Sequence, residues 1–353
     1  MSQSRPEIRE FLEPQQLGMS QAGAAKLVNA VRGLISTRRD FVCVKIDLAN
    51  AFNEISRTSI LETLESESSL SHLSAFAATI LAPETELETV GKRWGRTGQG
   101  VVQGDPPSGY LFDIGLQPSL VQLDSECGVA GGVARGGHDD ICALGPLEVV
   151  IPAVLRFQRE VWDRCHLRLQ WDKTQLFCWN GDIPADVPEG LTLAGEVLEG
   201  EFERGFEIYG IPVGTDKFVT HKLRQKAVVI ARDAVQTAGL LSADRQALWH
   251  SLRLSIAHRF HYYCQHTPPS LVEPVAEWLD NVLWSVLETA TGLPIPSGGE
   301  AEMRVRCPVT GLDSLSYQEW LVRLPVKLYG WGFRSLKDNC GPAYLGALET
   351  AIP

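Results

Sequence analysis

The sequence predicts an α+β protein in which a mixed region of helices and strands is followed by a helical region. Three observations support this fold class. Short β-branched and aromatic runs alternate with helical periods over the first 214 residues. Beyond residue 216 the pattern is almost wholly helical through about residue 292, so we expect a subdomain boundary near Gly214. With 353 residues, the chain is also long enough for two or three packed subdomains.

The first half of the mixed region alternates helix and strand. Apolar residues at helical spacing predict a helix over residues 20–36, and the next run, FVCVKIDL, has the composition of a strand that ends at Asp47. A helix over about 53–65 follows. The Thr-, Val- and Gly-rich residues 84–102 predict a hairpin.

The second half of this region continues the alternation. A helix is expected from Pro106, which suits a first helical turn, to about Leu123. Residues 128–145 predict two strands joined at 138–140, and a helix of about 18 residues begins at Leu147. LRLQW and TQLFCW are then two further strands. The order of strand, helix, helix, hairpin, helix and strand resembles a ferredoxin-like α+β sheet with its helices packed on one face.

Composition indicates the cellular compartment of the chain and the state of its cysteines. Neither a signal peptide nor an apolar run of ~20 residues is visible, so the sequence predicts a soluble intracellular protein with no membrane partner, and it does not distinguish nucleus from cytoplasm. The eight cysteines are scattered without a CxxC pair, which favours buried free thiols over a zinc module.

Charge is distributed unevenly along the chain. The net charge of -11 is unfavourable for a nucleic-acid partner, because phosphates are bound by Lys and Arg. In residues 217–263, however, eight Lys and Arg residues stand against two Asp residues, so this segment is net +6. Either a solvated helical face or a surface that contacts nucleic acid has this composition.

Three aspartates are the candidate chemical residues. Asp47 ends one predicted strand, and Asp139 and Asp140 lie in the turn of a predicted hairpin. If these strands are neighbours, three carboxylates converge, as hard Mg²⁺ ions require. Two such ions about 3.5–4 Å apart catalyse nucleotide addition to a growing strand. Because an Asp at a strand end or in a turn is more often a cap or a turn residue, the surrounding sequence decides between these interpretations.

The segments around these aspartates resemble, in order and spacing, the five motifs of a reverse transcriptase palm. For motifs A to E the segments are KIDLANAFNEISR (45–57), GVVQGDPPSGYLF (100–112), GHDDI (137–141), LQWDKTQLF (169–177) and IYGIPVG (208–214). The tail over 324–348 resembles the segment after the thumb in non-LTR retrotransposon proteins. The resemblance implies a ferredoxin-like polymerase palm with a helical thumb. Its parts would be a remnant of the fingers over 1–40, the palm over 41–215, the thumb over 216–300 and a C-terminal extension over 301–353.

The resemblance also implies a role for each matching residue. Asp47, Asp139 and Asp140 would hold two Mg²⁺ ions, for which Mn²⁺ can substitute, and Lys173 would stabilise the leaving pyrophosphate. The nucleotide site would comprise the Leu48 carbonyl, the amides of Asn50 and Ala51, the steric gate Phe52, and Gln103 with Gly104. The primer grip would comprise Tyr209, Gly210 and Gly214. The basic segment 217–263 would contact the template-primer backbone without reading bases.

Two departures from the family pattern bear on activity. Motif C of the family reads Tyr-Ala-Asp-Asp, whereas Gly137 and His138 precede the aspartates here, so an aromatic ring is missing and an imidazole replaces a small side chain. The segment before motif A is also far shorter than complete fingers.

The resemblance implies an RNA-directed DNA polymerase that uses an RNA template, a DNA primer and deoxynucleoside triphosphates. The departures leave two other interpretations open: an inactive remnant that binds RNA or an RNA–DNA hybrid, and a product without function. The sequence does not indicate the oligomeric state.

Overall fold

The computed structural model describes residues 5–81, 85–89, 91–179, 187–291, 304–305, 315–316, 323–328 and 332–351. The chain forms two compact units, which divide at Gly214. Unit 1 contains residues 1–214 and 350–353, and unit 2 contains residues 215–349. Residues 1–4 of the predicted fingers remnant, 292–300 of the predicted thumb, and part of the predicted C-terminal extension, including 329–331 of the tail segment, lie outside the described residues.

A five-stranded mixed sheet forms the centre of unit 1. Its order is β4 (Val133–Gly137), β5 (Asp140–Gly145), β1 (Val42–Ile46), β6 (Gln175–Phe177) and β7 (Thr192–Leu193). Neighbouring strands are antiparallel except β6 and β7, which are parallel. In the register of β1 with β5, Ile46 pairs with Ile141, so the residue after β1 lies beside the first residue of β5.

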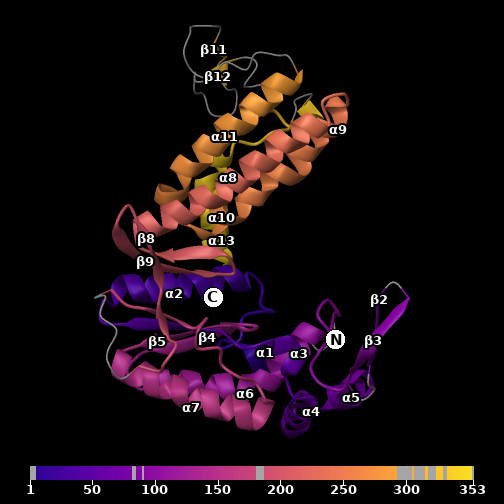
Figure 1. The fold of residues 1–353 in the computed structure, drawn as a ribbon, viewed down its shortest axis with the longest axis vertical. Helices are drawn as coiled ribbons and strands as arrows, with labels where there is room; N and C mark the ends of the chain where they lie inside the picture. The colour runs from indigo at the N-terminus through magenta and orange to yellow at the C-terminus, as the bar shows by residue number, and fades with distance from the viewer. Residues whose placement is uncertain are drawn as a thin grey trace. The chain divides into compact units, whose positions relative to one another are not determined.

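Helices cover both faces of this sheet (Figure 1). Helices α6 (Ser108–Gly128) and α7 (Leu147–Cys165) contact one face, and α2 (Gly23–Thr37) lies on the other. The expectation that the helices pack on one face is therefore wrong. Helices lie on both faces because β1 is apolar on both sides: four of its five residues are buried, as is typical of a strand covered on both sides.

Several shorter elements complete unit 1. They are α1 (Arg5–Leu12), α3 (Ala51–Glu54), α4 (Arg57–Ser66), η1 (Ser71–Leu73), α5 (Ser74–Leu81), the hairpin of β2 (Thr85–Thr89) and β3 (Lys92–Thr97), and an antiparallel sheet of β8 (Gly195–Leu198), β9 (Glu201–Ile208) and β10 (Ile211–Gly214).

Two predicted elements of unit 1 differ from the structure. The single helix expected over about 53–65 is two helices, because the chain breaks at Ile55 and the Ser56 hydroxyl caps α4 by accepting from Ser59 N at 3.3 Å. The predicted strand LRLQW is wrong: in this segment only Leu169 makes a bridge, with Leu48.

Unit 2 is mainly helical. Its described elements are α8 (Asp216–Leu240), α9 (Arg245–Ser251), a π-helical turn η2 (Leu252–Ile256), η3 (Ala257–Phe260), α10 (His261–His266), α11 (Pro269–Thr291), β11 (Arg304–Val305), β12 (Leu315–Ser316), η4 (Val326–Leu328) and α13 (Leu336–Ala351). Helix α8 packs along α11 (Figure 1), and buried side chains such as Leu223, Phe260 and Leu279 fill the core of this unit.

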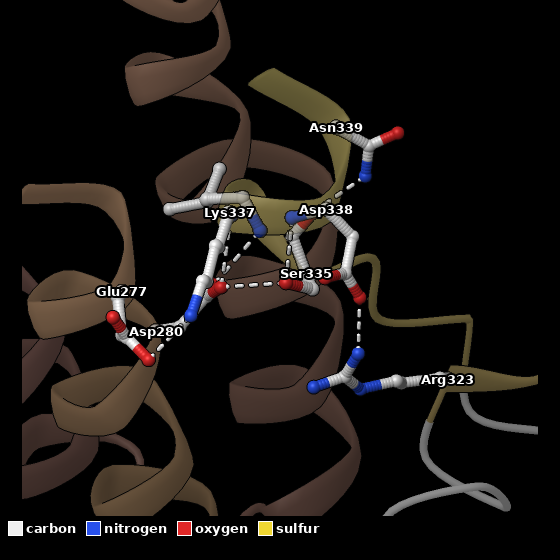
Figure 2. A network of polar contacts seen from close by, with 8 residues as sticks. Glu277, Asp280, Arg323, Ser335, Lys337, Asp338 and Asn339 are labelled. Atoms are coloured by element: carbon white, nitrogen blue, oxygen red, sulfur yellow. Dashed lines mark hydrogen bonds and ion pairs between the residues drawn. The ribbon is translucent and has the colours of Figure 1, made fainter. Parts of the chain in front are cut away.

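A buried carboxylate fixes the start of α13 (Figure 2). Asp280 of α11 is only 7% exposed, and it accepts hydrogen bonds from Ser335 Oγ at 2.8 Å, Leu336 N at 2.9 Å and Lys337 N at 3.1 Å. Burial raises the pKa of Asp280, while these donors act in the opposite direction. An anion at a helix N-terminus satisfies its free amides and favours its dipole, so Asp280 anchors α13 to α11.

The cysteines and the helix lengths bear on two expectations. Seven cysteines are described and all are free; six of them are buried, which confirms the prediction of buried thiols for those six, whereas Cys307 lies outside the described residues. Within the described ranges, no helix has the length and apolar character needed to cross a bilayer.

Candidate active site

Three aspartates occupy neighbouring positions where β1 ends and β5 begins. Asp47 directly follows β1, Asp140 is the first residue of β5, and Asp139 lies in the turn between β4 and β5. The pairing of β1 with β5 makes Asp47 the neighbour of Asp140. Backbone contacts hold Asp47, whose N–H donates to Thr174 Oγ1 at 3.2 Å and whose carbonyl accepts from Gln170 N at 2.9 Å. We call Asp47, Asp139 and Asp140 the carboxylate cluster.

The members of the carboxylate cluster repel one another. Burial raises the pKa of Asp47, and the charge of Asp140 adds to that rise, whereas Lys173 and Lys45 oppose it. Burial likewise raises the pKa of Asp139, with further contributions from Asp140 and Asp47. A bound cation would relieve this repulsion, because it favours the ionised form of every carboxylate around it.

The donor chemistry of the cluster fits a hard divalent cation, but one carboxylate already has a cationic partner. Lys45 Nζ lies 3.1 Å from Asp140 Oδ1. Lys45 precedes Asp47 by two residues and therefore lies on the same face of β1. Among the described residues, no three Asp, Glu, His or Cys side chains converge closely enough to hold a metal ion. The cluster therefore has oxygen donors of the type that Mg²⁺ prefers, but its three side chains are not gathered around one point, and Lys45 pairs with one of them.

A shallow pocket lies next to Asp47. It has a volume of about 480 Å³ and is lined by Ala49, Asn50, Arg168, Leu169, Gln170 and Lys173. Asn50 adopts a left-handed conformation with φ 45° and leads into α3, which begins at Ala51. Of the residues proposed for the nucleotide, Asn50 lines this pocket, as does Lys173. Leu48 pairs with Leu169 at its base.

The candidate steric gate rests on the motif B helix. The Phe52 ring stacks on Phe112 of α6 with centroids 4.4 Å apart and planes 11° from parallel. Gln103 and Gly104, by contrast, lie in an exposed turn before α6, and within the described part of the chain no recorded contact joins them to the carboxylate cluster. Of the segment 100–112, Phe112 thus contacts Phe52, and the roles of Gln103 and Gly104 stay predictions.

One primer-grip candidate reaches the hairpin of motif C. Tyr209, in the turn between β9 and β10, packs against Gly137, where an added Cβ would overlap the Tyr209 hydroxyl. The phenol thus fills the space that a side chain at position 137 would need. Gly210 completes the same turn with φ 74°, and Gly214 has φ 151°, where a Cβ would overlap the Arg204 carbonyl. These two glycines shape the backbone.

His138 is also built into its surroundings. Its Nδ1 lies 2.9 Å from Oδ1 of Asp113, a fully buried residue of α6. The side chain of Gln16 accepts from His138 N at 2.8 Å and donates to His138 O at 3.1 Å. Gly18 leaves room for the ring, since a Cβ there would lie 2.6 Å from His138 Nδ1. We call His138, Asp113 and Gln16 the histidine network.

Charge is nearly balanced within the histidine network. Burial raises the pKa of Asp113 to about 6, although its hydrogen bond with His138 acts against that rise. Burial of the imidazole opposes its protonation, but the bond to Asp113 and the charges of Asp113 and Asp139 outweigh burial and raise the pKa of His138. Asp113 Oδ2 is buried without a hydrogen-bond partner among the described residues.

No protein-family model and no curated protein matches this chain. It is similar to solved structures of telomerase. Apo telomerase from Candida tropicalis is 9% identical over 82% of this chain and 55% of that chain, with a TM-score of 0.44. Telomerase from Candida albicans in complex with the TWJ fragment of telomeric RNA is 10% identical over 82% and 51%, with a TM-score of 0.42. This chain spans about half the length of those chains, and likeness at this level carries no functional argument.

Three residues of the site were not singled out by the motifs. Lys45 had a signal in the sequence, since it lies two positions before Asp47 on one strand face. Asp113 also had one, because it is the single charged residue between Pro106 and Leu123 in an otherwise uncharged helix, and such a charge needs a partner when buried. Gln16 had none, because nothing local distinguishes it from any other loop glutamine.

Proposed function

We propose that this chain contains the palm of an RNA-directed DNA polymerase of the reverse transcriptase type. The observation that carries the proposal is the neighbourhood of Asp47, after β1, and Asp139 with Asp140, at the start of the paired strand β5. These carboxylates, with the Leu48 carbonyl, would hold two Mg²⁺ ions. When bound, the ions would lower the pKa of the primer hydroxyl and neutralise charge on the leaving pyrophosphate.

The other residues of the site would orient the substrates. The pocket beside Asp47 is polar and basic, so it suits the triphosphate, with Lys173 supplying positive charge. The Phe52 ring is braced by its stack on Phe112 and would exclude a ribose 2'-hydroxyl. The amides of Asn50 and Ala51 and the exposed turn of Gln103 and Gly104 would complete the nucleotide site, and the primer end would rest on Tyr209, Gly210 and Gly214.

The finer assignments belong to the same proposal. A ferredoxin-like palm, a helical thumb in unit 2 and an origin in a non-LTR retrotransposon are supported by the order of the five motifs and by the tail segment 324–348. The substrates would be an RNA template, a DNA primer and deoxynucleoside triphosphates. The net +6 segment 217–263 would supply the charge that contacts the template-primer backbone.

Primer extension tests this proposal. Purified protein with an RNA template, a DNA primer and deoxynucleotides should extend the primer in Mg²⁺ or Mn²⁺, and Asp139→Ala should abolish extension. Asp163→Ala is the matched control, since Asp163 is an exposed residue of α7 that contributes nothing to the cluster. If folded wild-type protein extends no primer with either ion, the polymerase proposal is overturned.

A second function is favoured by the ion pair at the cluster. Because Lys45 already partners Asp140, and Tyr209 fills the place of the motif C aromatic, the chain also suits an inactive protein that binds RNA or an RNA–DNA hybrid. Such a protein would show salt-sensitive binding of a hybrid that Asp139→Ala leaves unchanged, without extension. No binding at low salt would remove this alternative.

A further inference from the structure

Unit 2 contains a small basic pocket. It has a volume of about 190 Å³ and lies between the turns η2 and η3, the start of α10 and the segment that precedes α13. Its polar lining consists of Arg253, His258, His261 and Arg334, with Gly332 and Phe333 as the remaining wall from that segment. We call it the basic pocket.

The two arginines of the basic pocket have no acidic partner among the described residues. Two other cations of unit 2 are paired: Arg259 Nη1 lies 2.7 Å from Asp233 Oδ2, and Lys337 Nζ lies 2.6 Å from Glu277 Oε1. The contact recorded for Arg253 is with the Trp249 ring, whose centroid lies 5.2 Å from the guanidinium carbon. The pocket therefore holds two positive charges that the described part of the protein does not neutralise.

The two histidines also leave hydrogen-bonding capacity unused. Their Nδ1 atoms lie 3.0 Å apart, so one ring donates to the other. His261 Nε2 is buried and has no partner within the described residues. Burial, His258 and Arg334 lower the pKa of His261, which favours its neutral ring. When His261 is the donor at Nδ1, His258 carries its proton on Nε2, and this exposed ring of the pocket lining can donate it to an oxygen ligand.

The wall of the basic pocket is fixed in place. Gly332 has φ 70°, and a Cβ there would lie 2.8 Å from Arg253 Nε, so glycine is what allows the guanidinium its position. Gly332 N donates to Leu324 O at 2.8 Å. Directly after Arg334, Ser335 is bound by Asp280 (Figure 2), which holds this end of the segment against α11. The pocket is thus preorganised by contacts that do not involve its charges.

We propose that the basic pocket binds one phosphate group of a nucleic-acid strand. A phosphate offers several anionic oxygens, which match two guanidinium groups and an imidazole N–H. The volume of about 190 Å³ is large enough for one phosphate group. A strand is the fitting source, because Arg253, His258 and His261 of the pocket belong to the net +6 segment. The inference rests on the nucleic-acid binding proposed above, and not on catalysis.

The experiment uses the full chain and two probes, a short RNA–DNA hybrid and inorganic phosphate. Arg334→Gln should weaken hybrid binding about tenfold and reduce the slope of log K against log salt by about 0.9, the value for one phosphate contact. The matched control is Arg159→Gln, which removes the same charge from an exposed position on α7, outside the segments proposed to bind nucleic acid, and should alter neither quantity by as much. Equal losses in both variants would mean diffuse electrostatic attraction and would overturn the pocket.

Imidazole resonances of His258 and His261 supply a second readout. The hybrid should shift both in the wild type, and neither in Arg334→Gln. Shifts with inorganic phosphate but not with the hybrid would identify a site for free anions and overturn the strand assignment, and no shift with either probe would overturn the site. Gly332→Ala, which crowds Arg253, should reproduce the effect of Arg334→Gln with all charges kept.

The outcome is separable from that of the proposed polymerase. Asp139→Ala should abolish extension and leave the imidazole shifts intact, because Asp139 belongs to unit 1. Shifts in a protein that extends no primer would uphold the basic pocket while the catalytic proposal fails.

Discussion

The carboxylate cluster and the histidine network lie on either side of the turn between β4 and β5, and they differ in how well their charges are balanced. In the carboxylate cluster, burial and the charge of Asp140 raise the pKa values of Asp47 and Asp139, and the ammonium group of Lys45 pairs with Asp140, so negative charge exceeds positive charge. In the histidine network, Asp113 is matched by His138, and the side chain of Gln16 binds the His138 backbone on both sides. Excess charge is typical of a site that binds a ligand, and matched charge is typical of a packed interior. His138, where GHDDI differs from the motif C pattern, therefore lies in a region where its charge is matched by that of Asp113, although Asp113 Oδ2 has no hydrogen-bond partner among the described residues.

The largest expected effect is on the histidine network. His138→Ala should lower the free energy of unfolding by about 3 kcal/mol, because it leaves the carboxylate of Asp113 buried and unpaired. Urea denaturation measures this loss. Asp139→Ala is the matched comparison one position away, where removal of a repelled carboxylate should cost no more than about 0.5 kcal/mol.

The double variant sharpens this result. Replacing both His138 and Asp113 by Ala should be less costly than the sum of the single changes by more than about 1 kcal/mol, since the two side chains act as a pair. Equal losses for His138→Ala and Asp139→Ala would show that the two regions do not differ in the way described.

A smaller effect is expected at Gly137. Gly137→Ala should cost about 2 kcal/mol, because its Cβ overlaps the Tyr209 hydroxyl and forces the ring to move. Thermal or urea unfolding of the variant gives the value. In a Tyr209→Ala background the same substitution should be nearly neutral, and a persistent penalty there would mean that the backbone of β4, and not the phenol, excludes a side chain.

The positions of the three aspartates at strand ends were easier to predict from the sequence than the contacts around them, for a physical reason. Asp47 and the Asp139–Asp140 pair lie at the ends of strongly patterned elements, so the local sequence placed them at strand ends. The contacts of Lys45 with Asp140 and of His138 with Asp113 join residues far apart along the chain, and only the packed sheet brings them together.

The errors in the fold have the same origin. Leu167 and Leu169 of LRLQW are buried, but a buried extended loop shows the same alternation of apolar residues as a strand. Whether a neighbouring strand pairs with such a segment cannot be read from the local sequence, and here only the single bridge of Leu169 with Leu48 forms. The sheet of β8 to β10 was not predicted, because charged segments such as EFERGFEI have weak apolar alternation. The change to helix after residue 216, by contrast, extends over many turns and is visible in the sequence alone.

The smallest expected effect shows whether the carboxylate cluster binds a cation or only contains carboxylates that repel one another. Lys45→Met should lower stability by about 1 kcal/mol, since the ion pair with Asp140 is only partly buried. The same variant should gain more from Mg²⁺ than the wild type, because a cation then meets three carboxylates without a competing ammonium group. Melting temperatures with and without Mg²⁺ measure both effects.

Lys26→Met is the matched control, as Lys26 Nζ lies 3.5 Å from Glu13 Oε2 at similar exposure. If Mg²⁺ raises the melting temperature of both variants equally, the excess charge of the carboxylate cluster does not bind a cation, and the contrast between the two regions loses its functional meaning.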